Sequence, residues 1–122
     1  MSKVQPDAPI AAQPAMIDGI FRALADPTRR DVLERLSDHP ASVSELAAPH
    51  TMALPSFLEH LKILEGCGLV SSRKVGRVRT YSLAPDRLRL AEDWLGTQRR
   101  LWEGRLDRMD AYLLKLNKEE SA

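Results

Sequence analysis

The chain has 122 residues, with 18 basic and 17 acidic side chains and a formal net charge of +1. This length suits one domain, and an apolar content of 43% excludes wholesale disorder. The single cysteine excludes an internal disulfide, and no apolar run approaches the ~20 residues that a membrane span needs.

The first fourteen residues are predicted to form a disordered arm, because Pro6, Pro9 and Pro14 stand among alanines. They lack the charged stretch and apolar run of a signal peptide or anchor. We therefore expect a cytoplasmic protein whose ordered domain begins at Ala15.

Two helices are predicted next. The first is short and amphipathic, with four apolar residues at helical spacing: Ile17, Ile20, Phe21 and Leu24. The second is expected to run from Pro27 to Ser37, with Asp26 as its N-cap, because aspartate is a good cap and proline suits the first helical position. Asp38-His39-Pro40 ends it.

A helix-turn-helix is predicted from residue 41 to residue 67. Ala41-Ser42-Val43 fits a short extended segment, and either Ser42, with Glu45 completing a capping box, or Ser44 can cap a brief helix ending at Ala48. A longer helix is expected from Leu54-Pro55 to Cys67, where Gly68 suits the left-handed position after a helix. Two helices joined by a tight turn have the dimensions of this motif.

The pattern then changes to that of a β-hairpin. Residues 69–74 and 78–83 predict two strands around Val75-Gly76-Arg77. Between Leu69 and Ala84 there are four basic side chains and no acidic one: Arg73, Lys74, Arg77 and Arg79. A locally positive segment on a near-neutral protein is typical of a nucleic-acid contact, although lysine and arginine also protect edge strands.

A long final helix is predicted from Pro85 to Asn117, roughly 45 Å in length. A body of about 70 residues cannot cover its apolar stripe, and a two-fold copy of the chain is the simplest partner. We expect a homodimer in which a partner covers this helix. The expected interface residues on it are Trp94, Leu95, Trp102, Leu106, Met109 and Leu113.

The helix of residues 54–67 has a buried side centred on Phe57, Leu61 and Leu64. If its other side enters a major groove, Ser56 can bond to any base, Leu58 can contact a thymine methyl and Glu59 can accept a bond from cytosine. The other candidate DNA contacts on this helix are Pro55, His60 and Lys62. The alternatives are a solvated face with a Glu59–Lys62 pair, and a packed, hydrogen-bonded His60.

The basic hairpin is a candidate wing. Its side chains can lie on the DNA backbone, with Arg77 at the tip entering the minor groove. His39, His50 and Cys67 show no metal-ligand spacing, and no catalytic constellation stands out, so we expect neither a cofactor nor enzyme activity. Trp94, Trp102, Met109 and Tyr112 could line an effector pocket, but packing is the more ordinary role of such residues.

Several segments together resemble the ArsR/SmtB family of bacterial repressors. They are FRALADPTRR at 21–30, VSELA at 43–47, EHLKILE at 59–65, GLV at 68–70 and YSL at 81–83. The resemblance implies a winged helix-turn-helix of five helices plus a wing, mainly α with a small β-hairpin. It also implies a homodimer formed through the first and last helices, which represses by binding a partly palindromic operator. The first helix is then expected to contribute Ile17, Ile20, Phe21 and Leu24 to the dimer interface.

The resemblance places the recognition helix at residues 54–65 and the wing at residues 73–79. The chain departs from the family at Ala53, where serine or threonine is frequent, at Leu58, where serine is frequent, and at Glu59, where a basic or amide residue is frequent. The cysteine motif of the arsenic sensors is replaced by Ser44-Glu-Leu-Ala-Ala, and no histidine follows His60. The resemblance therefore implies a metal-independent member.

The sequence thus predicts a winged-helix domain over residues 15–84, completed by a dimerisation helix over 85–122. The expected function is a dimeric transcriptional repressor that binds a double-stranded DNA operator, with an effector left open. Two alternatives remain, a protein-interaction module on the same scaffold, which Glu59 favours, and a small-molecule sensor with its ligand near Trp94 and Trp102.

Overall fold

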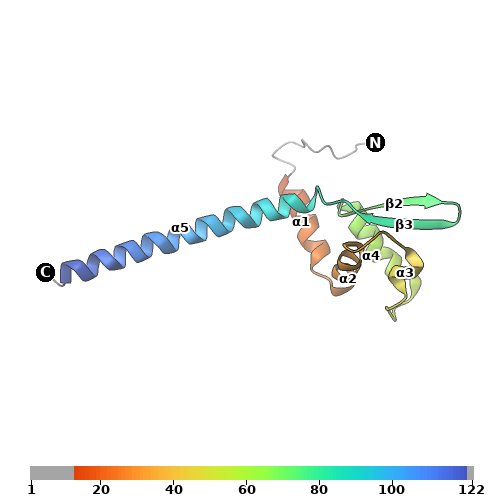
Figure 1. Cartoon of the computed structure of the whole chain (residues 1–122), viewed down its shortest axis with the longest axis horizontal. Coiled ribbons are helices and arrows are strands. Elements are labelled where there is room, and N and C mark those ends of the chain that lie inside the picture. Colours follow the sequence, from red (N-terminus) through yellow and green to blue (C-terminus); the bar gives the residue numbers. More distant parts are fainter. Residues whose placement is uncertain (1–12, 121–122) are drawn as a thin grey trace. The chain divides into compact units, whose positions relative to one another are not determined.

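The computed structural model describes residues 13–120, which form five helices and three strands (Figure 1). In chain order these are α1 (Gln13–Leu24), α2 (Pro27–Leu36), β1 (Ala41–Ser42), α3 (Val43–Ala47), α4 (Leu54–Gly66), β2 (Val70–Val75), β3 (Val78–Leu83) and α5 (Leu88–Glu120). The chain divides into two compact units between Ala91 and Glu92, within α5. Gln13 and Pro14 belong to α1 rather than to the predicted arm, the rest of which lies outside the described residues.

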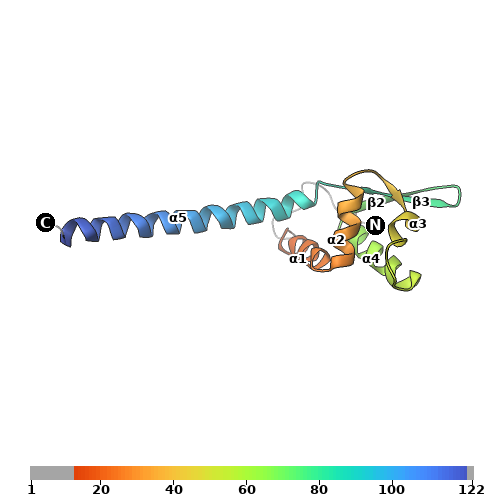
Figure 2. The same cartoon turned by 60° about the horizontal axis from the view of Figure 1, so that its bottom comes forward.

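The first unit is built on a small antiparallel sheet with strand order β1-β3-β2. Its helices α2, α3 and α4 lie on one side of the β2–β3 ribbon, as the two views of Figure 1 and Figure 2 show. β1 pairs Ala41 with Tyr81 and Ser42 with Thr80, which confirms the extended conformation expected for these two residues, whereas Val43 already begins α3. The sheet therefore joins the start of the helix-turn-helix to the predicted wing.

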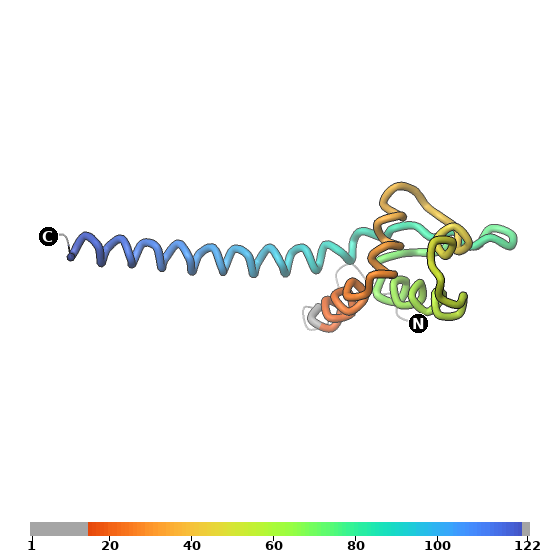
Figure 3. The backbone as a smooth tube through the Cα atoms, turned by 90° about the horizontal axis from the view of Figure 1, so that it is seen from below, coloured from red at the N-terminus to blue at the C-terminus, as the bar shows by residue number. Residues whose placement is uncertain are grey.

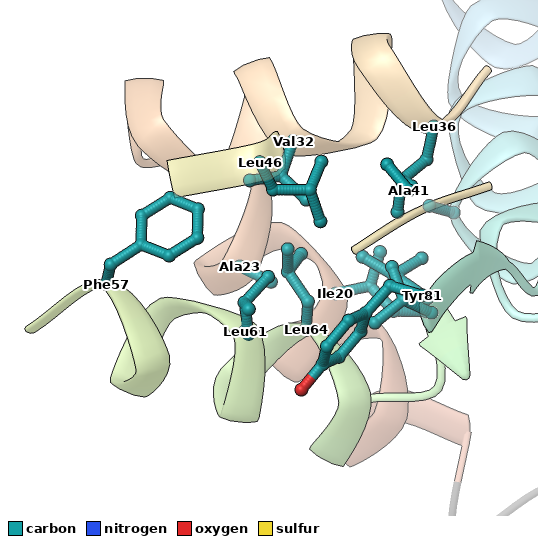
Figure 4. Close-up of a cluster of buried hydrophobic side chains, with 13 residues drawn as sticks. Ile20, Ala23, Val32, Leu36, Ala41, Leu46, Phe57, Leu61, Leu64 and Tyr81 are labelled. Carbon is teal, nitrogen blue, oxygen red and sulfur yellow. The ribbon is translucent and has the colours of Figure 1, made fainter. Parts of the chain in front are cut away.

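The core of the first unit lies where α1, α2, α3 and α4 meet the sheet. Figure 4 shows Leu61 and Leu64 of α4 directed toward Val32 of α2 and Leu46 of α3. All four side chains are fully buried. Ile20 is also fully buried in this core, so its expected place in a dimer interface is wrong: its position on α1 faces the protomer's own interior.

Local signals in the sequence explain how the helices start and stop. The Asp26 carboxylate accepts a hydrogen bond from the Arg29 amide at 3.1 Å, which caps α2. Ser42, rather than Ser44, caps α3, and Glu45 completes the predicted capping box. α4 ends in a Schellman motif at Gly68 (φ +80°), where the amides of Gly68 and Leu69 donate to the carbonyls of Glu65 and Leu64.

The final helix starts later than predicted. Ala84 donates its amide to the Leu69 carbonyl at 2.9 Å, which holds the chain beside the start of β2. Residues 85–87 then form a turn, and α5 begins at Leu88 rather than at Pro85. The predicted start at Pro85 is therefore wrong by three residues, because the chain turns after the Ala84–Leu69 pairing before the helix begins.

The cap of α2 carries a pH dependence. Burial acts to raise the pKa of Asp26, but the Arg29 amide and the nearby His60 and Arg29 side chains outweigh it and lower this pKa below its ordinary 3.8. A carboxyl with a lowered pKa in the folded state stabilises the fold above its ordinary pKa. That contribution is lost as the pH falls through the lowered value.

We predict that Asp26→Ala lowers the free energy of unfolding by about 1 kcal/mol at pH 7. Asp26→Asn should retain most of the cap, because its amide oxygen can still accept the Arg29 bond. The difference in free energy of unfolding between the wild type and Asp26→Asn should disappear as the pH falls below about 4. Urea unfolding from pH 3 to pH 7 measures both effects, and a gap that widened in acid would contradict this assignment.

Candidate nucleic-acid interface

Helix α4 presents two faces of opposite character. Phe57, Leu61 and Leu64 are at most 1% exposed and fix the helix to the core. The predicted contact residues on the other side are all exposed: Pro55, Ser56, Leu58, Glu59 and Lys62. The structure therefore brings these five side chains to one accessible surface, at the second helix of the helix-turn-helix.

The first turn of α4 has no side-chain cap. Ala53 occupies the N-cap position and makes no capping hydrogen bond, and Pro55 lies in the first turn. The first amides of a helix lack partners inside it, and they favour anions. The departure from the family at Ala53 thus leaves these donors to solvent or to an incoming phosphate.

His60 does not share the outward face. Its Nδ1 lies 3.0 Å from Nη1 of Arg29 and 3.6 Å from the Asp26 carboxylate. Because a guanidinium only donates hydrogen bonds, Nδ1 accepts from Arg29. The structure thus places His60 at the junction of α1, α2 and α4, in the packed alternative that the sequence left open, and away from the predicted contact surface.

The hairpin has a tighter turn than predicted. Val75 pairs with Val78, so only Gly76 and Arg77 form the loop. Gly76 has φ +62°, and Arg77 does not have positive φ, which is the pattern of a type II′ turn with glycine at its first central position. Figure 3 traces this turn beyond α3 and α4, and the register places Arg77 in its two-residue loop.

The basic residues of the hairpin divide between its two faces. Lys74 is opposite Arg79, and this pair lies on the same face as Val70 and Tyr81, toward the core. Arg73 lies on the other face. Like charges directly opposite each other destabilise a sheet, so the Lys74–Arg79 pair has no structural advantage and is typical of an anion-binding surface.

A groove of about 460 Å³ lies between α4 and the hairpin. Its lining residues are Val43, Leu58, Lys62, Glu65, Lys74, Arg77, Arg79 and Tyr81. Four of these side chains are cationic and one is a carboxylate, so the groove is electropositive. It joins the exposed face of α4 to the hairpin, and its charge suits a phosphate backbone.

Sequence reasoning missed Glu65, Ser72 and Tyr81 in this region. Ser72 donates its hydroxyl to Oε2 of Glu65 at 2.8 Å and accepts a bond from Nη1 of Arg79 at 2.8 Å. Burial, and then the Glu65 carboxylate, raises the pKa of Tyr81, against opposing effects of Arg79 and Ser72. Only the strand register, which was not assigned from the sequence, could have indicated this grouping.

Other titratable residues have local partners. His50 contacts Asp31 at 2.8 Å and packs on the ring of Phe57. Burial raises the pKa of Cys67, which favours the thiol. Among residues 13–120, no three histidine, cysteine or carboxylate side chains lie together in a way that could hold a metal ion. No helix in that range is both long and apolar enough to cross a membrane.

The second unit exposes large apolar side chains along α5. Trp102 is 64% exposed and Met109 is 59% exposed. The other predicted interface residues of α5 are exposed as well: Trp94, Leu95, Leu106 and Leu113. On α1, Ile17, Phe21 and Leu24 are half-buried.

These elements define a winged helix-turn-helix protein, as the sequence predicted. A family model described as a helix-turn-helix domain matches residues 24–73. A crystal structure of an ArsR family transcriptional regulator is similar over 74% of this chain and 93% of its own, with 53% identity and a TM-score of 0.71. This chain belongs to the ArsR family of transcriptional regulators, which confirms the resemblance.

Two curated relatives and one further structure extend the comparison. Regulator Rv2034 of Mycobacterium tuberculosis is 43% identical over 56% of this chain and 64% of its own length. Repressor SdpR of Bacillus subtilis is 29% identical over 65% of this chain and 88% of its own length. The match thus spans less than two thirds of Rv2034. A homodimeric winged helix-turn-helix domain from Mycobacterium bovis is 25% identical over 75% of this chain and 86% of its own, with a TM-score of 0.59.

The turn geometry predicts that Gly76→Ala loosens the wing. An L side chain at positive φ costs roughly 1 kcal/mol, so amide exchange in β2 and β3 should increase about fivefold. Gly66→Ala is the matched control, because a side chain at either glycine meets no atom within 4 Å and, of these two glycines, Gly76 alone has positive φ. Equal exchange in both variants, measured by mass spectrometry, would exclude the type II′ turn.

Proposed function

We propose that this protein is a sequence-specific DNA-binding repressor that acts as a homodimer on a partly palindromic operator, without a metal. One observation carries the proposal: the exposed face of α4 and the basic hairpin border the same electropositive groove. A helix and a cationic β-loop on one surface suit simultaneous contact with a major groove and the adjacent backbone.

Each contact residue has a proposed role. The start of α4 enters the major groove, where Ser56 and Leu58 meet base edges and Glu59 accepts a bond from cytosine. Lys62 and Lys74 contact phosphates, and Arg73 reaches the backbone from the other face of the hairpin. Arg77, at the exposed tip, enters the minor groove. The bond from Arg29 supports a structural role for His60.

The apolar surface of α5 supports the homodimer. Six of its large apolar side chains in the proposed interface are exposed, and contiguous apolar patches of this kind mark association sites. The related Mycobacterium bovis domain is described as homodimeric. Two copies would present two α4 helices about 34 Å apart, which matches successive major grooves on one side of DNA.

The proposed metal independence is supported by the positions of the candidate ligands. His50 is engaged by Asp31, His39 contacts the Pro40 carbonyl, and Cys67 lies beside the end of α4. A regulator without enzyme activity, in the cytoplasm, is consistent with the family assignment.

A second candidate function is a protein-interaction module. Glu59 lies within the exposed face of α4, where a carboxylate is repelled by phosphate, and Leu58 beside it is 41% exposed. Gel shift on the promoter of the chain's own gene separates the two functions, because an interaction module would bind no duplex at low salt.

We predict that wild-type affinity for operator DNA falls with salt, with a slope of log K on log salt near −5 to −7 if about 6–8 phosphates are contacted. Arg77→Ala should weaken binding to all sequences and reduce the steepness by about 2, because each protomer of the homodimer loses one cationic contact. Glu59→Gln should instead change which base pair is preferred.

Arg89→Ala serves as the charge-matched control for Arg77→Ala. Arg89 is exposed at the start of α5, outside the groove. Removal of its charge should therefore leave the salt slope equal to that of the wild type within experimental error. Fluorescence anisotropy from 50 to 300 mM salt, on operator and scrambled duplexes, measures all three variants. A wild-type slope near zero would refute DNA binding through this surface.

The dimer gives a separate prediction. Trp102→Glu combined with Leu106→Glu should convert the protein to a monomer, because charges replace apolar side chains that a partner must cover. Glu103→Gln with Asp107→Asn is the control for altered charge on the same turns of α5. Sedimentation equilibrium distinguishes the species, and a wild type that is monomeric at 100 μM would contradict the proposed assembly.

A further inference from the structure

Three side chains connect the elements of the proposed DNA surface. Glu65 lies in the last turn of α4, Ser72 in β2 and Arg79 in β3. The Ser72 hydroxyl donates to Oε2 of Glu65 at 2.8 Å and accepts from Nη1 of Arg79 at 2.8 Å. One hydroxyl thus bridges a carboxylate on the recognition helix and a guanidinium on the wing.

The donor and acceptor groups of the bridge determine the direction of its two hydrogen bonds. A serine hydroxyl has one proton to donate. Here the Glu65 carboxylate accepts the hydrogen bond from that hydroxyl, and the hydroxyl oxygen accepts a hydrogen bond from the Arg79 guanidinium. Both bonds have a charged partner, and such bonds are about twice as strong as neutral ones. Consecutive bonds of this kind also polarise each other. The bridge therefore favours one orientation of the hydroxyl and one position of the Arg79 side chain.

The bridge lies beside a buried ring. Ser72 pairs directly with Tyr81 across the strands, and Tyr81 is only 5% exposed. This neighbour excludes part of the solvent that would otherwise compete for the hydrogen bonds. The raised pKa of Tyr81, caused first by burial and then by Glu65, is consistent with a phenol that stays neutral beside the carboxylate.

The bridge also separates Arg79 from the other cations of the groove. Arg79 pairs with Lys74 across the strands, but its guanidinium bonds to Ser72, which lies two residue pairs farther from the turn. Within the described residues, the side chains of Lys74 and Arg77 take part in no hydrogen bond or ion pair. These two cations can meet a phosphate directly, whereas Arg79 already has a partner within the protein.

We propose that Glu65, Ser72 and Arg79 form a positioning clamp that fixes the wing relative to α4 before DNA binds. A two-stranded ribbon is only marginally stable on its own, and ordering it during binding would reduce affinity. The clamp removes part of that cost. Arg79 acts through Ser72 and Glu65 rather than as a phosphate ligand, which revises its expected role. Its effect on affinity rests on the proposed function.

The clamp itself can be tested in the free full-length chain. Ser72→Ala removes both bonds of the bridge without a change in charge, and amide exchange in β2 and β3 should increase at least fivefold, the size expected for the loss of one net hydrogen bond. Ser72→Thr retains a hydroxyl and should behave as wild type. Ser71→Ala, an exposed neighbour on the other face of the strand, is the matched control. Unchanged exchange in Ser72→Ala would overturn the clamp.

Salt titration of DNA binding then separates positioning from phosphate contact. Ser72→Ala and Arg79→Met should each lower affinity about fivefold with the salt slope unchanged. The double variant should be no weaker than either single one, because both remove the same bridge. A slope reduced by about 2 in Arg79→Met, one contact from each protomer, with additive losses, would make Arg79 a phosphate ligand and overturn its positioning role.

The two proposals fail in different ways. If the wild-type chain binds no duplex while Ser72→Ala still loosens the wing, the DNA function is wrong and the clamp remains. If the wild type binds with a steep salt slope while Ser72→Ala changes neither exchange nor affinity, the clamp is wrong and the DNA function remains.

Discussion

The buried face of α4 is the constraint on which the rest of the site depends. Phe57, Leu61 and Leu64 pack against α2 and α3, and full burial of one such side chain contributes about 2 kcal/mol. This packing determines the rotation of the helix about its axis. A rotation by one residue position would turn Leu58 inward and Phe57 outward, so the composition of the polar face is a consequence of the core beneath it.

The site combines this rigid helix with a ribbon whose own electrostatics are unfavourable. Lys74 and Arg79 face each other across β2 and β3, and a lone hairpin would gain nothing from that pairing. The strand β1 supports the ribbon at its base by pairing with Thr80 and Tyr81. The regulator thus keeps excess positive charge on an element that its core holds at the base and that the Glu65–Ser72–Arg79 bridge links to α4.

Local signals predicted much of the fold, and long-range contacts account for the differences. Asp26-Pro27, Ser42 with Glu45, and Gly68 identified the helix ends because each acts within a few residues. The late start of α5 depends on the Ala84–Leu69 bond, and Ile20 proved to be core because α1 packs on the body of its own protomer. Exposure of the α4 contact residues followed helical periodicity, whereas the Ser72 bridge depends on strand register, which was not assigned from the sequence.

Gly68 is subject to two separate restrictions. Its backbone has φ +80°, and a Cβ built there would lie 2.6 Å from Cγ of Arg87. An asparagine or aspartate, which tolerates the left-handed conformation better than most residues, would still collide with the arginine stem. Shortening Arg87 would make room but leave the backbone strain. An evolutionary path that replaces this glycine therefore needs at least two coordinated changes, and the junction between the end of α4 and the chain leading into α5 should diverge slowly among descendants of this protein.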